Sequence, residues 1–305
     1  MQYNIENYMK RDIRQKTYRP SSADRRTRQS GNASARKSPA GNKPRRRTKK
    51  KGVGVRISLR VWIAIIVFIL FALYSLIQRP FDKSYETGAK APGRAYRYAV
   101  DISHHNPGNI VWDSLHVMID SRGNTTKSVN QADDILPVSF VILKASEGGT
   151  LKDKKFHRYW KEAARAGYGR GAYHFFRSSK SPEEQARNYI RTVGRIREND
   201  LPPILDIESI HKGCTRKELN TKALTWLRII GEHYGRTPIV YSYESFINNM
   251  LSDEIKENYP LWVAHYREQK PEREGWMMWQ FTDKAVVYGI DGLVDLNVIS
   301  PGFTD

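Results

Sequence analysis

Two acids separated by one residue are the clearest chemical feature of this sequence. Asp206 and Glu208 follow the apolar stretch 202–205, with Ile207 between them. In a β-strand successive side chains point to opposite faces, so both acids would project from the same face. Their Cα atoms would lie about 6.6 Å apart, which lets two carboxyl groups act on one bond, as glycoside hydrolysis requires. An Asp-x-Glu is more often a solvated strand edge or a helix cap, so this interpretation depends on the surrounding chain.

Polar residues also stand late in other predicted strands. Strand-like composition occurs in eight segments, 96–103, 139–145, 170–176, 203–208, 238–243, 261–265, 276–281 and 293–298. Their late polar residues are Asp101, Glu147, Tyr173, His174, Asp206, Glu208, Tyr241, Tyr243, His265, Tyr266, Gln280, Asp295 and Asn297. Active sites of (β/α) barrels form at the C-terminal ends of the strands. We therefore expect these side chains to share one mouth, where clustered acids push their pKa values apart.

Helical patterns alternate with the strands. Apolar residues recur at helical spacing from Phe156 and stop at Gly167, a helix-ending residue. Ser181 and Thr215 each open a capping box. Alternating strands and helices favour a mainly parallel sheet. The predicted fold is α/β, a modified (β/α) TIM-like barrel with eight strands and reduced helices over residues 96–305.

The chain before the barrel has a different composition. Residues 1–60 contain 19 Lys or Arg against three acids and few large apolar residues, which predicts a disordered basic tail. Residues 61–78 carry no charge, and as a helix they would cover about 27 Å, the hydrocarbon thickness of a bilayer. They predict a single transmembrane helix. Residues 79–95, which contain Pro and Gly, are expected to form a linker.

The basic flank of the apolar segment predicts the topology. The positive-inside rule places residues 1–60 in the cytoplasm and the barrel on the outer, periplasmic or cell-wall side of the inner or plasma membrane. A cleaved signal peptide is the alternative, with Ala89-Lys90-Ala91 as its site, but this site lies some ten residues past the apolar run. We expect the tail to face anionic lipid and not nucleic acid.

No cofactor or metal is expected. His104, His105, His174 and His265 have spacings that fit no usual zinc motif. Cys214 is the only cysteine, so no intrachain disulfide can form.

Short stretches in a fixed order resemble the family 25 glycoside hydrolases, the muramidases of the lysozyme type. They include Val100-Asp101-Ile102-Ser103, Gly171-Ala172-Tyr173-His174-Phe175 and Leu205-Asp206-Ile207-Glu208, and together occupy 100–106, 112–113, 140–148, 166–167, 171–175, 205–208, 261–264, 279–282 and 289–297. The resemblance implies cleavage of the β-1,4 bond between N-acetylmuramic acid and N-acetylglucosamine in peptidoglycan glycan strands, with retention of configuration.

The resemblance also implies roles for the acids. Glu208 would be the general acid and then base, and Asp206 would stabilise charge on the substrate acetamido group. Asp101 and Asp295 would complete the acidic mouth. Glu208, which lies beside a second carboxylate and apolar neighbours, is expected to have a raised pKa and to hold its proton. Two same-face acids leave no room for a water between them, which favours retention.

A second set of residues is expected to bind substrate. It comprises Glu147, Tyr173, His174, Tyr243, Trp262, Tyr266 and Gln280, whose aromatic members could stack on sugar rings. Residues 116–137 are an insertion relative to the family, expected either to shape the glycan groove or to be a surface excursion.

Two alternative functions remain open. One is a membrane-tethered peptidoglycan-binding module without turnover, which the presence of all four acids disfavours. The other is a chitinase-like hydrolase that uses the same paired acids, which product analysis would distinguish.

Overall fold

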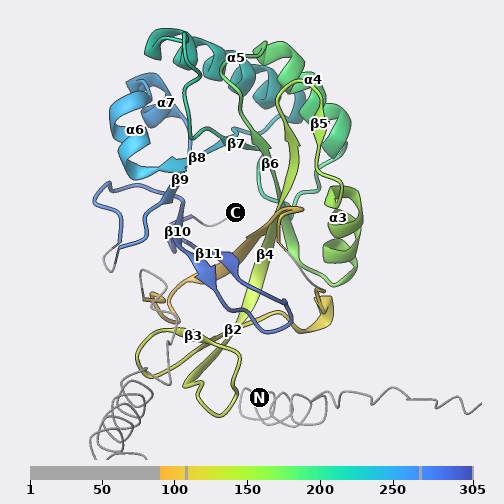
Figure 1. Ribbon diagram of the computed structural model, residues 1–305, viewed down its shortest axis with the longest axis vertical. Coiled ribbons are helices and arrows are strands. Elements are labelled where there is room, and N and C mark those ends of the chain that lie inside the picture. Colours follow the sequence, from red (N-terminus) through yellow and green to blue (C-terminus); the bar gives the residue numbers. More distant parts are fainter. Residues whose placement is uncertain (1–89, 107–108, 268–269, 304–305) are drawn as a thin grey trace, which may run out of the picture. The chain divides into compact units, whose positions relative to one another are not determined.

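The computed structural model describes residues 90–106, 109–267 and 270–303. These residues belong to one compact unit (Figure 1). The predicted tail, the predicted transmembrane segment 61–78 and most of the predicted linker lie outside the described residues. Among the residues described, no helix has the length and apolar character needed to cross a bilayer.

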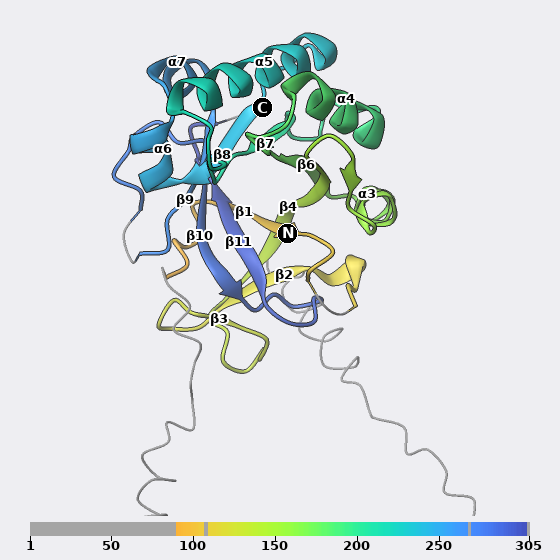
Figure 2. The same ribbon diagram turned by 45° about the horizontal axis from the view of Figure 1, so that its top comes forward.

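Eight strands close into a barrel, as the sequence predicts (Figures 1 and 2). They are β1 (Arg97–Ile102), β4 (Asp134–Glu147), β6 (Gly169–Phe175), β7 (Ile204–Asp206), β8 (Ile239–Tyr243), β9 (Leu261–Ala264), β10 (Met278–Ala285) and β11 (Val294–Ile299). Neighbours in this order are paired, and β1 pairs with both β4 and β11 to close the ring.

The last strand runs against the others. β11 is antiparallel to both β10 and β1, whereas the remaining pairs of the ring are parallel. Only residues 286–293 join β10 to β11, and a parallel connection needs a crossover of a dozen residues or more. Asp295 therefore stands near the start of its strand, yet it pairs with Asp101 near the end of β1 and reaches the same mouth.

Helices cover the barrel unevenly, in agreement with the predicted reduction. They are η1 (Trp112–Ser114), α3 (Phe156–Arg165), α4 (Pro182–Val193), α5 (Arg216–Tyr234), α6 (Glu244–Met250) and α7 (Asp253–Asn258). In the described part of the chain, no helix follows β9. The predicted capping box is confirmed at Thr215, which pairs reciprocally with Glu218, whereas Ser181 is an N-cap without the return bond: its side chain accepts a hydrogen bond from the Glu184 amide.

The insertion 116–137 is neither a groove wall nor a loose excursion. It forms β2 (His116–Ile119) and β3 (Thr125–Thr126), and β2 pairs antiparallel with the first residues of β4. Val117 and Met118 are completely buried. The hairpin thus extends the sheet at the end where β4 begins, opposite the mouth. Both faces of β2 are covered, and the turn supplies the polar composition.

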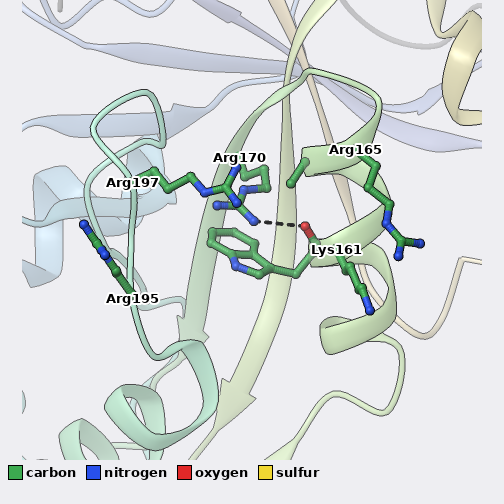
Figure 3. Close-up of a pocket in the computed structure, with 7 residues that line it drawn as sticks. Lys161, Arg165, Arg170, Arg195 and Arg197 are labelled. Carbon is green, nitrogen blue, oxygen red and sulfur yellow. Dashed lines mark hydrogen bonds between the residues drawn. The ribbon is translucent and has the colours of Figure 1, made fainter.

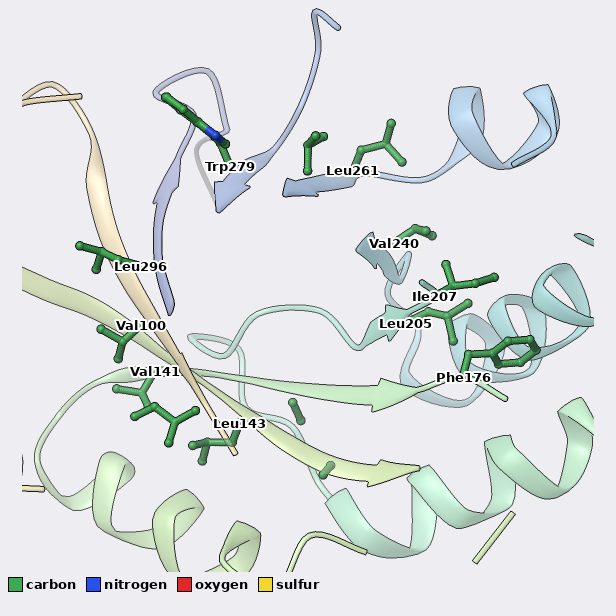
Figure 4. Packing of buried hydrophobic residues seen from close by; sticks show 14 of the residues in the cluster. Val100, Val141, Leu143, Phe176, Leu205, Ile207, Val240, Leu261, Trp279 and Leu296 are labelled. Atoms are coloured by element: carbon green, nitrogen blue, oxygen red, sulfur yellow. The ribbon is translucent and has the colours of Figure 1, made fainter. Parts of the chain in front are cut away.

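Strand alternation creates two apolar layers. Side chains such as Phe140, Ile142, Ile204 and Met278 fill the barrel interior. Those on the opposite strand faces, including Val100, Val141, Leu143, Leu205, Ile207, Val240, Leu261 and Leu296, form the second cluster (Figure 4). At Gly169 a Cβ would lie 2.4 Å from the Phe140 ring, so glycine is required where this ring crosses β6.

Candidate active site

Alternation along the strands brings the four predicted acids to one mouth. Asp101 is 7% exposed and Asp206 is 5% exposed, at the mouth ends of β1 and β7. Glu208 lies two residues past Asp206 and is half-buried. Asp295 faces Asp101 across the β1–β11 pair. Besides burial, the charge of Asp101 raises the pKa of the other three acids, and the charge of Glu208 raises those of Asp206 and Asp295, so the four carboxyl groups form one electrostatic cluster.

Asp101 and Asp295 form the first pair within this cluster. Burial, and then the charge of Asp101, raises the pKa of Asp295 to about 9. Burial also raises the pKa of Asp101, but its Oδ2 accepts hydrogen bonds from Asn297 Nδ2 at 2.7 Å and Gln280 Nε2 at 3.0 Å. These bonds favour the carboxylate form. The shared proton therefore resides on Asp295 at neutral pH.

Asp206 and Glu208 form the second pair. Burial raises the pKa of Asp206 well above its usual value, and the charge of Glu208 adds to the rise. Burial also raises the pKa of Glu208, and the charge of Asp101 adds to the rise. Because each of these carboxyl groups acts on the pKa of the other, the two titrate as a pair. The sequence predicted the raised pKa of Glu208, but not the larger rise at Asp206.

One oxygen of Asp206 is left without a protein partner. Among the described residues, the buried Oδ1 accepts no hydrogen bond. A buried acceptor without a donor is costly, and in an open mouth a donor from a bound ligand can satisfy it.

Lys144 is a member of the mouth to which the sequence analysis gave no role. Its side chain is 11% exposed, and its charge lowers the pKa of both Asp206 and Glu208. Lys144 Nζ donates to Glu147 Oε2 at 2.7 Å. The signal was present in the sequence, since Lys144 interrupts the apolar strand 139–145 at a position that faces the barrel interior.

Gln280 connects the acids to two tyrosines. Its Oε1 accepts hydrogen bonds from the hydroxyls of Tyr241 at 2.8 Å and Tyr266 at 2.6 Å. Its Nε2 faces Asp101 at 3.0 Å and Asp295 at 3.4 Å. The two hydroxyl donors fix the amide orientation, so the amino group points to the carboxylates.

Three further predicted residues lie at or beside the mouth. Tyr243 and Tyr266 are each 41% exposed, and the Tyr243 hydroxyl donates to the Glu208 backbone oxygen at 2.9 Å. Glu147, at the end of β4, also accepts from Arg177 Nε at 2.9 Å. Partial burial acts to raise the pKa of Glu147, but hydrogen bonds from Lys144 and Arg177 outweigh it and lower that pKa.

Two other predicted residues lie deeper in the barrel, below the acids. Tyr173 is partly exposed and pairs with Lys144 across β4 and β6, and burial, and then the charge of Asp206, raises its pKa. Trp262 is 2% exposed beneath the acids, and its Nε1 donates to Asn297 Oδ1 at 2.8 Å. Because Asn297 binds Asp101, Trp262 supports the acidic cluster from below.

His174 points away from the mouth. Its ring is completely buried, with Nδ1 2.8 Å from Ser146 Oγ and a stacked contact to Trp226 at 5.6 Å. Burial lowers the pKa of His174 to about 4, so the ring is neutral. Expecting His174 at the mouth beside Tyr173 was wrong, because adjacent strand residues face opposite sides.

Several hollows border the barrel in the described part of the chain, and two of them are lined by several cations. One, of about 450 Å³, adjoins the mouth and is lined by His104, His105, Lys144, Glu147, Leu151, Lys152, Asp153, Lys154 and Arg177. A larger one, of about 780 Å³, is lined by Trp160, Lys161, Ala164, Arg165, Arg170, Arg195 and Arg197 (Figure 3). It lies where β6 begins, so the acids are at the other end of the barrel. Within the described residues, no three His, Cys, Asp or Glu side chains group as a metal site.

Comparison with known proteins agrees with this geometry. The sequence profile of the glycosyl hydrolases family 25 matches residues 100–290. The chain belongs to this family. Family 25 relatives by sequence include Lysozyme M1 of Streptomyces globisporus, 30% identical over 212 residues that cover 65% of this chain and 66% of that protein.

A second relative has no function in its name. "Uncharacterized protein YegX" of Escherichia coli strain K12 is 38% identical over 170 residues, which cover 55% of this chain and 61% of that protein. The chain thus spans about three fifths of this relative's length.

Solved structures share the fold of this family 25 chain. The bacterial lysozyme from Streptomyces coelicolor has a TM-score of 0.55 and 27% identity, covering 67% of this chain and 92% of that one. A family 25 glycosyl hydrolase from Bacillus anthracis has a TM-score of 0.56 at 23% identity, covering 69% and 92%.

Proposed function

We propose that this family 25 protein is a peptidoglycan hydrolase. It cleaves the β-1,4 bond between N-acetylmuramic acid and N-acetylglucosamine with retention of configuration, as an N-acetylmuramidase. Glu208 serves as general acid and then base, and Asp206 assists the substrate acetamido group. The observation that carries the proposal is the placement of Asp206 and Glu208, two residues apart at the end of β7, in a mouth that also holds Asp101 and Asp295. The names of relatives such as Lysozyme M1 support it.

The unpartnered oxygen of Asp206 supports its proposed role. The 2-acetamido group of either sugar carries one N–H donor. Asp206 Oδ1 is a buried acceptor for which the described residues supply no donor. An acetamido N–H placed there would satisfy it and would orient the acetamido carbonyl for attack on the adjacent anomeric carbon.

Substrate binding would also move the proton to the acid. A hydrogen bond to a carboxylate favours its ionised form and lowers its pKa. An N–H donated to Asp206 would therefore lower the pKa of Asp206 and leave a proton on Glu208. Glu208 is the more exposed of the two, so it can reach the glycosidic oxygen. Once the bond breaks, the Glu208 carboxylate can take a proton from the incoming water.

Product analysis tests the reaction. The full chain is incubated with purified peptidoglycan, and released fragments are reduced with borohydride and analysed by mass. Reduced N-acetylmuramic acid ends are expected. In a separate NMR experiment on the unreduced reaction mixture, the first product anomer should be β. Reduced N-acetylglucosamine ends would contradict the bond assignment, and an α anomer would contradict retention. Cleavage of chitin oligomers at an equal rate would support the chitinase-like alternative, and binding without release would support the recognition module.

We also propose that residues 61–78 anchor the protein in the inner or plasma membrane, with the barrel on the outer side. The support is the uncharged 18-residue apolar run and its basic N-terminal flank, which is also expected to contact anionic lipid. Protease added to spheroplasts should digest a C-terminal tag and spare an N-terminal one. Recovery of the full chain in the soluble fraction would contradict the anchor.

A further inference from the structure

The hollow beside the mouth carries a charge opposite to that of the catalytic acids. Four cations line it, Lys144, Lys152, Lys154 and Arg177, and we call this set the basic arm. Its two acidic neighbours are already engaged. Glu147 binds both Lys144 and Arg177, and the buried Asp153 binds His104 Nδ1 at 2.7 Å.

Two members of the basic arm are available to a ligand. Lys152 and Lys154 are exposed, and neither forms an ion pair with any of the described residues. Lys144 and Arg177 are held in place from below, with Lys144 Nζ 4.8 Å and Arg177 Cζ 4.5 Å from the centre of the Phe175 ring. The hollow therefore presents net positive charge from fixed positions.

The basic arm is continuous with the mouth. Lys144 belongs to both, because its charge acts on Asp206 and Glu208. Around the barrel, β4 and β6 lie on one side of β7, and β8 and β9 lie on the other. The basic arm is on the first side. Tyr243, at the end of β8, and Tyr266, just after β9, are on the second. The acids of β7 thus stand between a cationic side and an aromatic side.

The segment that carries Lys152 is rigidly held. Lys152 lies on β5 (Leu151–Lys152), which pairs with Ser146 and Glu147 at the end of β4. Asn188 Nδ2, from α4, donates to the backbone oxygens of Gly148 at 3.0 Å and Leu151 at 2.9 Å. A preorganised hairpin loses little entropy when it binds a ligand.

We propose that the basic arm binds the carboxylates of the peptide stem attached to N-acetylmuramic acid, so that the enzyme prefers stem-bearing glycan. This inference rests on the proposed function. In stem-bearing strands the lactyl carboxyl of N-acetylmuramic acid is held in an amide, so the acidic groups lie out on the stem, away from the neutral sugar rings. Removal of the stem leaves only the lactyl carboxylate, which lies directly against the ring and does not reach as far as the stem carboxylates. Aromatic side chains on one side of the acids suit sugar rings, and cations on the other side suit the acidic branch.

The test uses the full chain, a Lys152→Gln/Lys154→Gln variant and two soluble substrates. One is uncross-linked glycan with intact stems, and the other is the same glycan after an amidase has removed the stems. We expect the variant to raise KM on stem-bearing strands roughly fivefold, with kcat unchanged, because two exposed ion pairs are lost. On stripped strands the variant should match the wild type. Added salt should reduce the difference.

A matched control removes the same charge elsewhere. Lys161→Gln/Arg165→Gln changes two exposed cations of the hollow at the other end of the barrel (Figure 3). This control should leave KM unchanged on both substrates. An equal loss for the Lys152/Lys154 variant on both substrates, or no loss on either, would overturn the stem proposal.

Direct binding separates this inference from the proposed function. In the Glu208→Gln background, titration calorimetry should give tighter binding of stem-bearing than of stripped strands, and the lysine variant should abolish the difference. Equal binding of the two strands would refute the stem site even if the protein is a hydrolase. Absence of cleavage by the wild type, with the binding preference intact, would refute only the hydrolase proposal.

Discussion

Replacing Asp295 by Asn should stabilise the protein, and more so as the pH rises. The pKa of this carboxyl is about 9 in the folded protein against 3.8 for an ordinary aspartate. Between these values the folded state holds a proton that the unfolded chain has released, so the free energy of unfolding falls as pH rises. In Asp295→Asn neither state titrates at this position, and the amide can still donate to Asp101.

The size of the effect follows from the pKa difference. For each pH unit above 3.8, the free energy of unfolding of the wild type falls by at most about 1.4 kcal/mol relative to the variant. The difference therefore reaches at most about 4 kcal/mol at pH 7. Water at the open mouth screens the site, so we expect about 2 kcal/mol at pH 7 and almost no difference at pH 4. Urea unfolding of wild type and variant from pH 4 to pH 9 measures this. A Glu257→Gln variant, which changes an exposed acid on α7, is the control and should show no such trend.

A variant that is less stable than the wild type, or a difference that does not change with pH, would refute the reasoning. Either result would mean that Asp295 is ionised in the folded protein. The proton would then have to lie elsewhere in the acidic cluster.

Three further predictions concern the roles of other buried charged or polar groups. The Asp200→Ala variant leaves Arg170, whose side chain is 5% exposed, without its ion pair. Urea unfolding should show a free energy of unfolding about 3 kcal/mol lower than that of the wild type, and a loss below 1 kcal/mol would contradict this. His174→Gln should alter stability but not KM for glycan, because the ring is buried away from the mouth, and a large change in KM would restore its predicted binding role. Lys144→Gln removes a charge that lowers the pKa of Glu208, so the alkaline limb of the pH–rate profile should move to higher pH; a move to lower pH would contradict the assignment.

Two-residue periodicity explains which site residues the sequence could predict. It placed Asp206 and Glu208 on one face of a strand, and the structure brings both to the mouth with Asp101 and Asp295. The same rule places Tyr173 and His174 on opposite faces of their strand, so it would have excluded His174 from the mouth. Lys144 was overlooked because a single lysine in an apolar strand was given no role.

The direction of β11 and the burial of the β2–β3 hairpin could not be predicted from the sequence. Strand composition carries no direction, so β11 could not be recognised as antiparallel. The turn of the β2–β3 hairpin is polar, which concealed the buried Val117 and Met118. The larger rise in pKa at Asp206 than at Glu208 also could not be predicted, because it depends on how deeply each carboxyl is buried.

The most direct test of the central claim compares the Glu208→Gln variant with the wild type and with the Glu257→Gln control on purified peptidoglycan. If Glu208 is the general acid, its amide variant should release muropeptides about 10² to 10⁴ times more slowly, while the control keeps the wild-type rate. Unfolding in urea should show that both variants remain folded. Release by Glu208→Gln at the wild-type rate would contradict the account.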